Sequence, residues 1–178
     1  VGNAGGVTFR NQTTNANINF VVSTLSGPVS ALTINGTTGT VFGNQINANY
    51  ADVAERFAAD TELEAGTVVE LGGTAEITKV SAELSDKVFG VISTKAAYLM
   101  NSAAGSDATH PPVAMTGRVP VQVVGMVKKG DRLVSAGNGI ARAARPGEAS
   151  AFNVIGRSLV DKTTPDHGTI EAIVTIKN

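Results

Sequence analysis

The chain has 178 residues and a formal net charge of −1, with 14 Lys and Arg against 15 Asp and Glu. Nucleic-acid binders neutralise phosphates with clustered Lys and Arg, so this balance argues against nucleic acid as a partner. No apolar run approaches the roughly 18 residues of a membrane-spanning helix, which predicts no membrane insertion, and the absence of Cys excludes disulfides.

Residues 1–50 differ in composition from the rest of the chain. Arg10 is their single charged side chain, and nine of the fifty residues are Asn. The run 33–42, TINGTTGTVF, alternates apolar residues around a Gly/Asn/Thr turn and predicts a hairpin. Apolar positions are too few for a core within one chain. A disordered linker is one interpretation. The regular Val, Ile and Phe favour the other, in which short strands wind around a threefold axis and other chains complete the core.

Residues 51–178 are typical of a conventional β domain and hold the other 13 Lys and Arg and all the Asp and Glu. Gly and Pro punctuate the apolar runs at intervals expected of a small β-sandwich or barrel. The predicted strands are 67–71, 88–93, 118–124, 132–135, 153–159 and 169–176. Two stretches, 52–59 and 80–86, look helical over about two turns each.

The domain looks internally duplicated. Residues 65–93 and 129–159 each contain a Gly before a short strand, a Gly turn, and a later strand with a central Gly. The first and last Gly are 24 residues apart in one copy, Gly66 to Gly90, and 26 in the other, Gly130 to Gly156. Two similar β units around a pseudo-twofold axis would explain this spacing, and chance similarity among Gly-rich strands is the alternative.

Three short motifs in a fixed order carry a family resemblance: YADVAERF at 50–57, GTVVELGG at 66–73 and VFGVIST at 88–94. With the fibre-like segment upstream, they resemble the C-terminal domain of phage tail-fibre and neck-appendage proteins over roughly residues 45–160. The resemblance implies a homotrimer in the virion, as an extracellular tail fibre or appendage. Its implied partners are other tail or neck proteins and, as a further candidate, a host surface receptor.

Some members of that family are intramolecular chaperones that cut themselves just before the Asp of a D-x-x-E pair. Carried over, the resemblance makes Asp52 and Glu55 the catalytic pair and Ala51–Asp52 the bond, which is at most a single-turnover autoproteolysis. Two carboxylates can serve as general acid and base, and on a helical turn residues three apart share a face. Two departures count against cleavage, because Ala51 replaces a hydroxyl residue and Val53 replaces an aromatic one.

The alternative gives the same residues a structural role. Asp52 would be the N-cap of a short helix, Glu55 would complete a capping box, and Arg56 would pair with a carboxylate of another chain. We expect the Ala51–Asp52 bond to stay mostly intact. Both carboxylates should lie where the three chains stop intertwining, at the hydrated end of a dry shaft.

Other candidate sites are weaker. His110 and His167 lie in predicted loops, where a metal on a trimer axis is one interpretation and solvated side chains the other. No nucleophile elbow or phosphate loop is present, so we expect no metal and no cofactor. The polar loop 98–112 is either a receptor-contacting loop or plain surface.

These observations predict an all-β homotrimer. Residues 1–50 would form an intertwined β fibre shaft resembling a β-helix, and residues 51–178 a globular β-barrel or sandwich tip with an internal duplication. The tip would trimerise and register the chains. The alternative functions are a host-receptor-binding fibre tip and a single-turnover self-cleaving intramolecular chaperone. The chain begins at Val1 without signal-peptide features, so we expect a piece of a longer protein.

Overall fold

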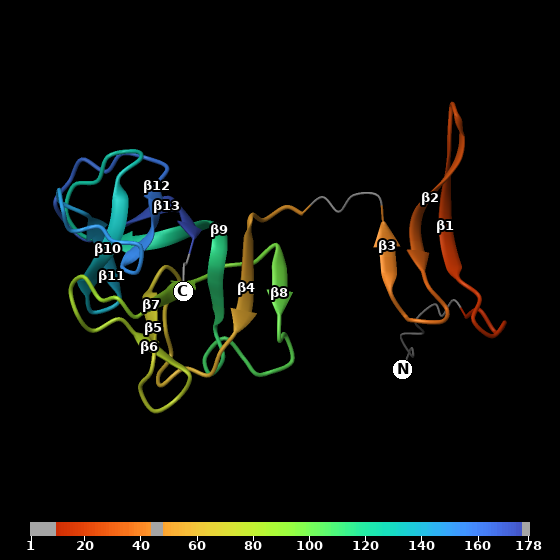
Figure 1. The fold of residues 1–178 in the computed structure, drawn as a ribbon, viewed down its shortest axis with the longest axis horizontal. Coiled ribbons are helices and arrows are strands. Elements are labelled where there is room, and N and C mark those ends of the chain that lie inside the picture. Colours follow the sequence, from red (N-terminus) through yellow and green to blue (C-terminus); the bar gives the residue numbers. More distant parts are fainter. Residues whose placement is uncertain (1–9, 44–47, 176–178) are drawn as a thin grey trace, which may run out of the picture. The chain divides into compact units, whose positions relative to one another are not determined.

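The computed structural model describes residues 10–43 and 48–175. The chain divides into two compact units, residues 1–47 and 48–178, which are described separately here (Figure 1). The described residues form only strands, turns and loops, which confirms the all-β prediction. The helices predicted at 52–59 and 80–86 are therefore wrong.

The smaller unit is a three-stranded antiparallel sheet in the order β1-β2-β3. Its strands are β1 (Ile18–Thr24), β2 (Gly27–Ile34) and β3 (Val41–Gly43). The pairing of Ile34 with Val41 confirms the hairpin predicted at 33–42. In its turn, the Asn35 carboxamide oxygen accepts hydrogen bonds from the backbone N–H groups of Thr37 and Thr38, both at 2.9 Å.

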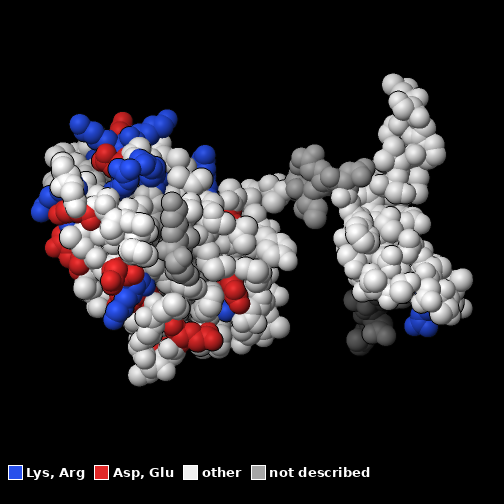
Figure 2. Space-filling view, viewed as in Figure 1, with Lys and Arg blue, Asp and Glu red and all other residues white. Residues whose placement is uncertain are grey.

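This smaller sheet has no core of its own. Not one of residues 10–43 is buried. Phe20 is 45% exposed and Phe42 is 55% exposed, although both are large apolar side chains on strands. Figure 2 shows the contrast in charge on the face in view, since coloured Lys, Arg, Asp and Glu spread over the larger unit and are nearly absent from the smaller one.

The described part of the larger unit, residues 48–175, contains ten strands. They are β4 (Asp52–Arg56), β5 (Val68–Leu71), β6 (Ile77–Lys79), β7 (Val88–Ile92), β8 (Tyr98–Met100), β9 (Pro112–Val123), β10 (Arg132–Gly137), β11 (Ile140–Ala143), β12 (Val154–Ser158) and β13 (Gly168–Thr175). All six strands predicted from the sequence are present, as β5, β7, β9, β10, β12 and β13. The strands β4, β6, β8 and β11 and the first half of β9 were not predicted.

Five of these strands close into a barrel. They follow the order β11-β10-β12-β13-β9, and a parallel pairing of Ala141 in β11 with Val123 in β9 closes the ring. Alternate residues of these strands are buried in its main apolar cluster, as expected for small barrels. They include Val119, Val121, Val123, Leu133, Ala141, Ile155, Ile170, Ala172 and Val174.

The remaining strands extend from β9. β7, β5 and β6 continue the sheet beyond β9, while β4 and β8 pair alongside its first half. A second apolar cluster lies here, centred on Val69, Ile77 and Phe89, with the Phe57 ring edge-on to Phe89 at 5.0 Å between centroids. Among the described residues, 48–175 thus form two apolar clusters, whereas 10–43 form none.

Strand register confirms the internal duplication. In the first copy β5 lies between β6 and β7, and in the second β10 lies between β11 and β12, always antiparallel. Val69 pairs with Gly90, and Leu133 pairs with Gly156. A β-bulge follows each of these pairs at once. The two central glycines therefore occupy equivalent places.

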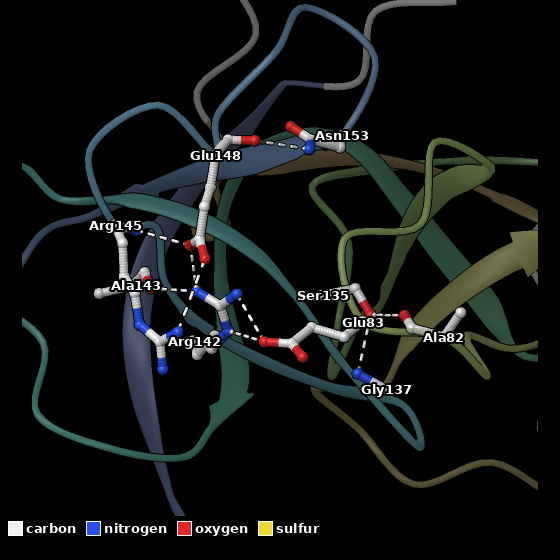
Figure 3. A network of polar contacts seen from close by, with 9 residues as sticks. All are labelled: Ala82, Glu83, Ser135, Gly137, Arg142, Ala143, Arg145, Glu148 and Asn153. Carbon is white, nitrogen blue, oxygen red and sulfur yellow. Dashed lines mark hydrogen bonds and ion pairs between the residues drawn. The ribbon is translucent and has the colours of Figure 1, made fainter.

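A polar network joins the two copies (Figure 3). Arg142 donates from Nε to Glu83 Oε1 at 2.8 Å and from Nη1 to Glu148 Oε2 at 2.7 Å. The hydrogen bond from Arg142 is the main cause that lowers the pKa of Glu148. Ser135 Oγ donates to the Ala82 carbonyl at 2.6 Å. These contacts tie the segment predicted as a helix at 80–86 to β10 and β11, and tertiary bonding outweighs its weak helical preference.

Candidate functional site

The predicted catalytic residues lie on β4, a strand and not a helix. β4 runs parallel to β8, with Val53 opposite Tyr98, and antiparallel to β9, with Asp52 opposite Gly117. Strands on both sides satisfy its backbone groups, which a two-turn helix at this position would not achieve. Asp52 is therefore not a helix N-cap, and no capping box with Glu55 forms.

Asp52 and Glu55 do not share a face. Successive side chains of a strand point to opposite sides, so residues three apart diverge. Asp52 is 3% exposed, whereas Glu55 is only half-buried. The single-face pair expected from the sequence is wrong because it assumed helical geometry. The expected hydrated position is also wrong for Asp52.

The Asp52 carboxyl is held in a dry position beside the junction bond. Its Oδ2 atom is buried without a hydrogen-bond partner among the described residues. Its backbone carbonyl accepts the Ala97 N–H at 2.9 Å, which fixes the chain on the β8 side. A buried carboxyl oxygen without a donor carries a desolvation cost, and such costs are often found at functional sites.

The carbonyl of the Ala51–Asp52 bond is also held. Its oxygen accepts a hydrogen bond from the Arg118 backbone N–H at 3.2 Å. Gly117, the partner of Asp52 on β9, has φ +112°, and a Cβ there would lie 2.2 Å from the Ala51 oxygen. Only glycine permits this approach. A backbone N–H on a carbonyl oxygen is the kind of donor that stabilises negative charge when the carbonyl is attacked.

Arg56 is engaged within its own chain. Its Nη1 lies 2.7 Å from Asp107 Oδ1 and donates to the His110 carbonyl at 2.7 Å. Asn101 Nδ2 donates to the Arg56 carbonyl at 3.1 Å. These contacts form an intrachain clamp that fastens the loop after β8 to β4. The expected pairing of Arg56 with another chain stays a prediction.

The two histidines belong to no metal cluster within the described residues of one chain, and a metal on a trimer axis stays a prediction. Within residues 10–43 and 48–175, no group of three His, Cys, Asp or Glu side chains could hold a metal ion. His110 Nδ1 lies 3.1 Å from Thr109 Oγ1, and His167 is exposed. The described part of the chain also contains no helix with the length and hydrophobicity needed to cross a membrane.

Two residues of this site, Gly117 and Arg118, were missed as functional candidates. The sequence predicts a strand that starts at Arg118, and the preceding Gly was the available signal. A Gly flanked by strand residues often marks a bulge or a close backbone approach. Nothing local to the sequence indicates that the approaching backbone belongs to Ala51.

Comparison with known proteins bears on this junction. A family model described as Peptidase_G2, IMC autoproteolytic cleavage domain, matches residues 3–109, which include β4. Comparison with curated proteins finds no match. Among solved structures, the chain is similar to a crystal structure of the pre-mature bacteriophage phi29 gene product 12, with a TM-score of 0.57 and 19% identity. The similarity covers 83% of this chain and 24% of that one, so this chain spans about a quarter of its length.

Proposed function

We propose that this chain, which belongs to the Peptidase_G2, IMC autoproteolytic cleavage domain family, is a phage virion fibre protein whose residues 48–178 trimerise and register three N-terminal segments. The family match confirms the resemblance read from the three sequence motifs. The similarity to a phage protein supports a place in a virion tail fibre or appendage. The proposed partners are two further copies of this chain and other virion proteins.

One observation carries this proposal: residues 10–43 form strands but bury no side chain. A small sheet with exposed Phe20 and Phe42 is at best marginally stable in water by itself. Packing against the same segment of other chains would bury these side chains. A domain that associates first raises the effective concentration of the attached segments, and the segments can then pair in register.

Sedimentation velocity and native mass spectrometry at micromolar concentration test the proposal. We expect trimers for the full chain and for residues 48–178. Phe42→Asn in the full chain is a useful companion variant, because it should leave the trimer intact while making the N-terminal segment more sensitive to protease. A monomer for both the full chain and residues 48–178 would contradict the proposed function.

Self-cleavage at the junction is the second candidate. The Arg118 N–H on the Ala51 carbonyl and the dry Asp52 carboxyl beside the same bond favour it. Ala51 offers no hydroxyl, and Glu55 points to the other side of β4. We therefore propose that the bond stays mostly intact in this chain and that the junction serves assembly. Receptor binding through the loop 98–112 stays a prediction.

Intact mass and denaturing electrophoresis of freshly expressed protein decide between these two roles. We expect the wild type to run as one band at 18.1 kDa. If it yields residues 1–51 and 52–178 while Glu55→Gln stays whole, Glu55 is catalytic and the structural assignment is wrong. Fragments from Ala51→Ser alone would reveal a dormant site. Asp86→Asn, at an exposed carboxylate away from the junction, is the matched control.

A further inference from the structure

Three arginines lie in one row across the outside of the barrel. Arg118 on β9 is directly opposite Ile173 on β13, Ile173 is opposite Arg157 on β12, and Arg157 is opposite Arg132 on β10. Directly opposite residues of paired strands project from the same face of a sheet. All three arginines are exposed, and Ile173 between them is 44% exposed.

The row borders a cleft of about 650 Å³. Arg132, Arg157 and Ile173 line it, together with small residues of the 149–151 turn, and no carboxylate is among its described lining residues. Figure 2 shows Lys and Arg gathered at the upper edge of the larger unit, over the region of β12 in Figure 1. Two arginines and the apolar side chains of Val154 and Ile173 therefore line the cleft together.

None of the three arginines of this row is paired with a carboxylate among the described residues. Arg132 and Arg157 lie directly opposite each other on neighbouring strands, an arrangement of like charges that generally destabilises a sheet. Arg157 Nη1 donates to the Gly130 carbonyl at 2.9 Å, which leaves its charge without a carboxylate. The ion pairs of the described residues involve Arg56, Arg142 and Arg145 and none of the three row arginines. A carboxylate from outside this chain would turn the repulsion into pairing.

The chain carries a segment of matching charge elsewhere. Glu62 and Glu64 are both exposed, on either side of the half-buried Leu63, and neither enters an ion pair within the described residues. In an extended segment, side chains two residues apart are roughly 7 Å from one another. Neighbouring strands of a sheet are roughly 4.8 Å apart, so a spacing of roughly 7 Å lies between one and two strand separations. Two carboxylates at that spacing can therefore reach arginines on different strands.

We propose that the arginine row binds the 62–64 segment of a second copy of this chain. The inference rests on the proposed trimer and adds the surfaces that form it. Two different patches that meet head to tail give a ring when the rotation between copies closes, as in a threefold assembly. Because the Arg118 backbone also holds the Ala51 carbonyl, the interface lies next to the junction and would exclude water from it.

Charge reversal tests this pairing in the full chain. Arg132→Glu and Arg157→Glu should each raise the trimer dissociation constant by at least about 10-fold, because buried or close interface charge pairs are costly to break. Lys87→Glu, on an exposed turn, is the matched control and should leave the trimer unchanged. Circular dichroism of each variant checks that the β fold is kept.

The decisive variant combines both surfaces. Arg157→Glu with Glu64→Arg, or Arg132→Glu with Glu62→Arg, should restore at least part of the lost association. The inference is overturned if charge reversal in the arginine row leaves the trimer dissociation constant at its wild-type value. It is also overturned if neither double variant recovers part of the lost affinity. In both cases the proposed trimer is unaffected. A monomeric wild type would instead contradict the proposed function, on which this inference rests.

Discussion

Gly117 shows how one residue can set the geometry of the junction. Its φ of +112° lies in a region that L side chains rarely adopt, and its missing Cβ leaves room for the Ala51 carbonyl. Arg118 can therefore donate its N–H to that carbonyl, and β4 can enter the sheet beside β9. The fold of the larger unit and the environment of the candidate bond depend on the same glycine.

Gly117→Ala should destabilise residues 48–178 by more than the strained backbone alone, which costs about 1–3 kcal/mol. Gly125→Ala is the matched control, because Gly125 also has a positive φ, +81°, but open space where its Cβ would be. Chemical denaturation of both variants measures the difference. Equal destabilisation by the two substitutions would show that the close approach of Gly117 to Ala51 does not contribute to stability.

Asp60 organises the turn between β5 and β6. Its Oδ1 accepts the Ala75 N–H at 2.5 Å and both the N–H and the hydroxyl of Thr74 at 2.9 Å. The bond from Ala75 is the main cause that lowers the pKa of Asp60, with the Thr74 hydroxyl next. Ionised Asp60 therefore stabilises the folded state above the carboxyl's usual pKa, and this contribution is lost as the pH falls through its lowered value.

Asp60→Asn should accordingly lower the melting temperature at pH 7. The gap in melting temperature should narrow as the pH falls below about 4, because the Asp60 carboxyl then protonates in the unfolded chain while the folded state still holds it ionised. Thermal unfolding followed by circular dichroism across this pH range is the measurement. The exposed Asp86→Asn serves as control, and a gap that stays constant with pH would contradict the assigned role of the charge.

At the scale of elements, each duplicated unit has a central glycine with no space for a side chain. Gly90 has Val113 Cγ1 and the Ala114 carbonyl where its Cβ would be, and Gly156 has the Ile173 carbonyl there. In each copy the central glycine lets its strand lie close against the next one. The two copies thus share a packing requirement as well as a β-bulge.

Gly90→Ala and Gly156→Ala should therefore both destabilise the larger unit, because the added methyl meets atoms at 2.3 Å and 2.2 Å. Overpacking of this kind typically costs about 1–3 kcal/mol. Gly168→Ala is the control, since its nearest neighbour is the flexible Lys162 side chain. Urea unfolding of all three variants is the measurement, and a neutral effect at either central glycine would argue against equivalence.

At the scale of the whole molecule, the two units should differ in independent stability. Residues 48–178 bury two apolar clusters and should unfold cooperatively when expressed alone. A peptide of residues 10–43 should show no cooperative transition, because none of its side chains is fully buried. Thermal scans by circular dichroism check both. A stable, cooperative β assembly of the isolated peptide would remove the need for a registering domain.

Much of the fold could be predicted from local sequence. The β5, β7 and β12 strands were predicted because short apolar runs between Gly and polar turns are local signals. The repeated glycine spacing likewise predicted the duplication. In contrast, the run DVAERF at 52–57 is helix-like locally and becomes a strand, because β8 and β9 supply partners that lie 45 to 65 residues away in the chain.

The sequence by itself determined the contrast between an uncharged, core-poor segment and a charged β domain, since composition alone limits how much apolar surface a segment can bury. Tertiary structure alone decided that Asp52 and Glu55 diverge, that Arg118 holds the Ala51 carbonyl, and that the three arginines share a row. Each depends on strand register. Register is set by pairing between distant segments, whereas sequence patterns report only on residues that are near one another in the chain.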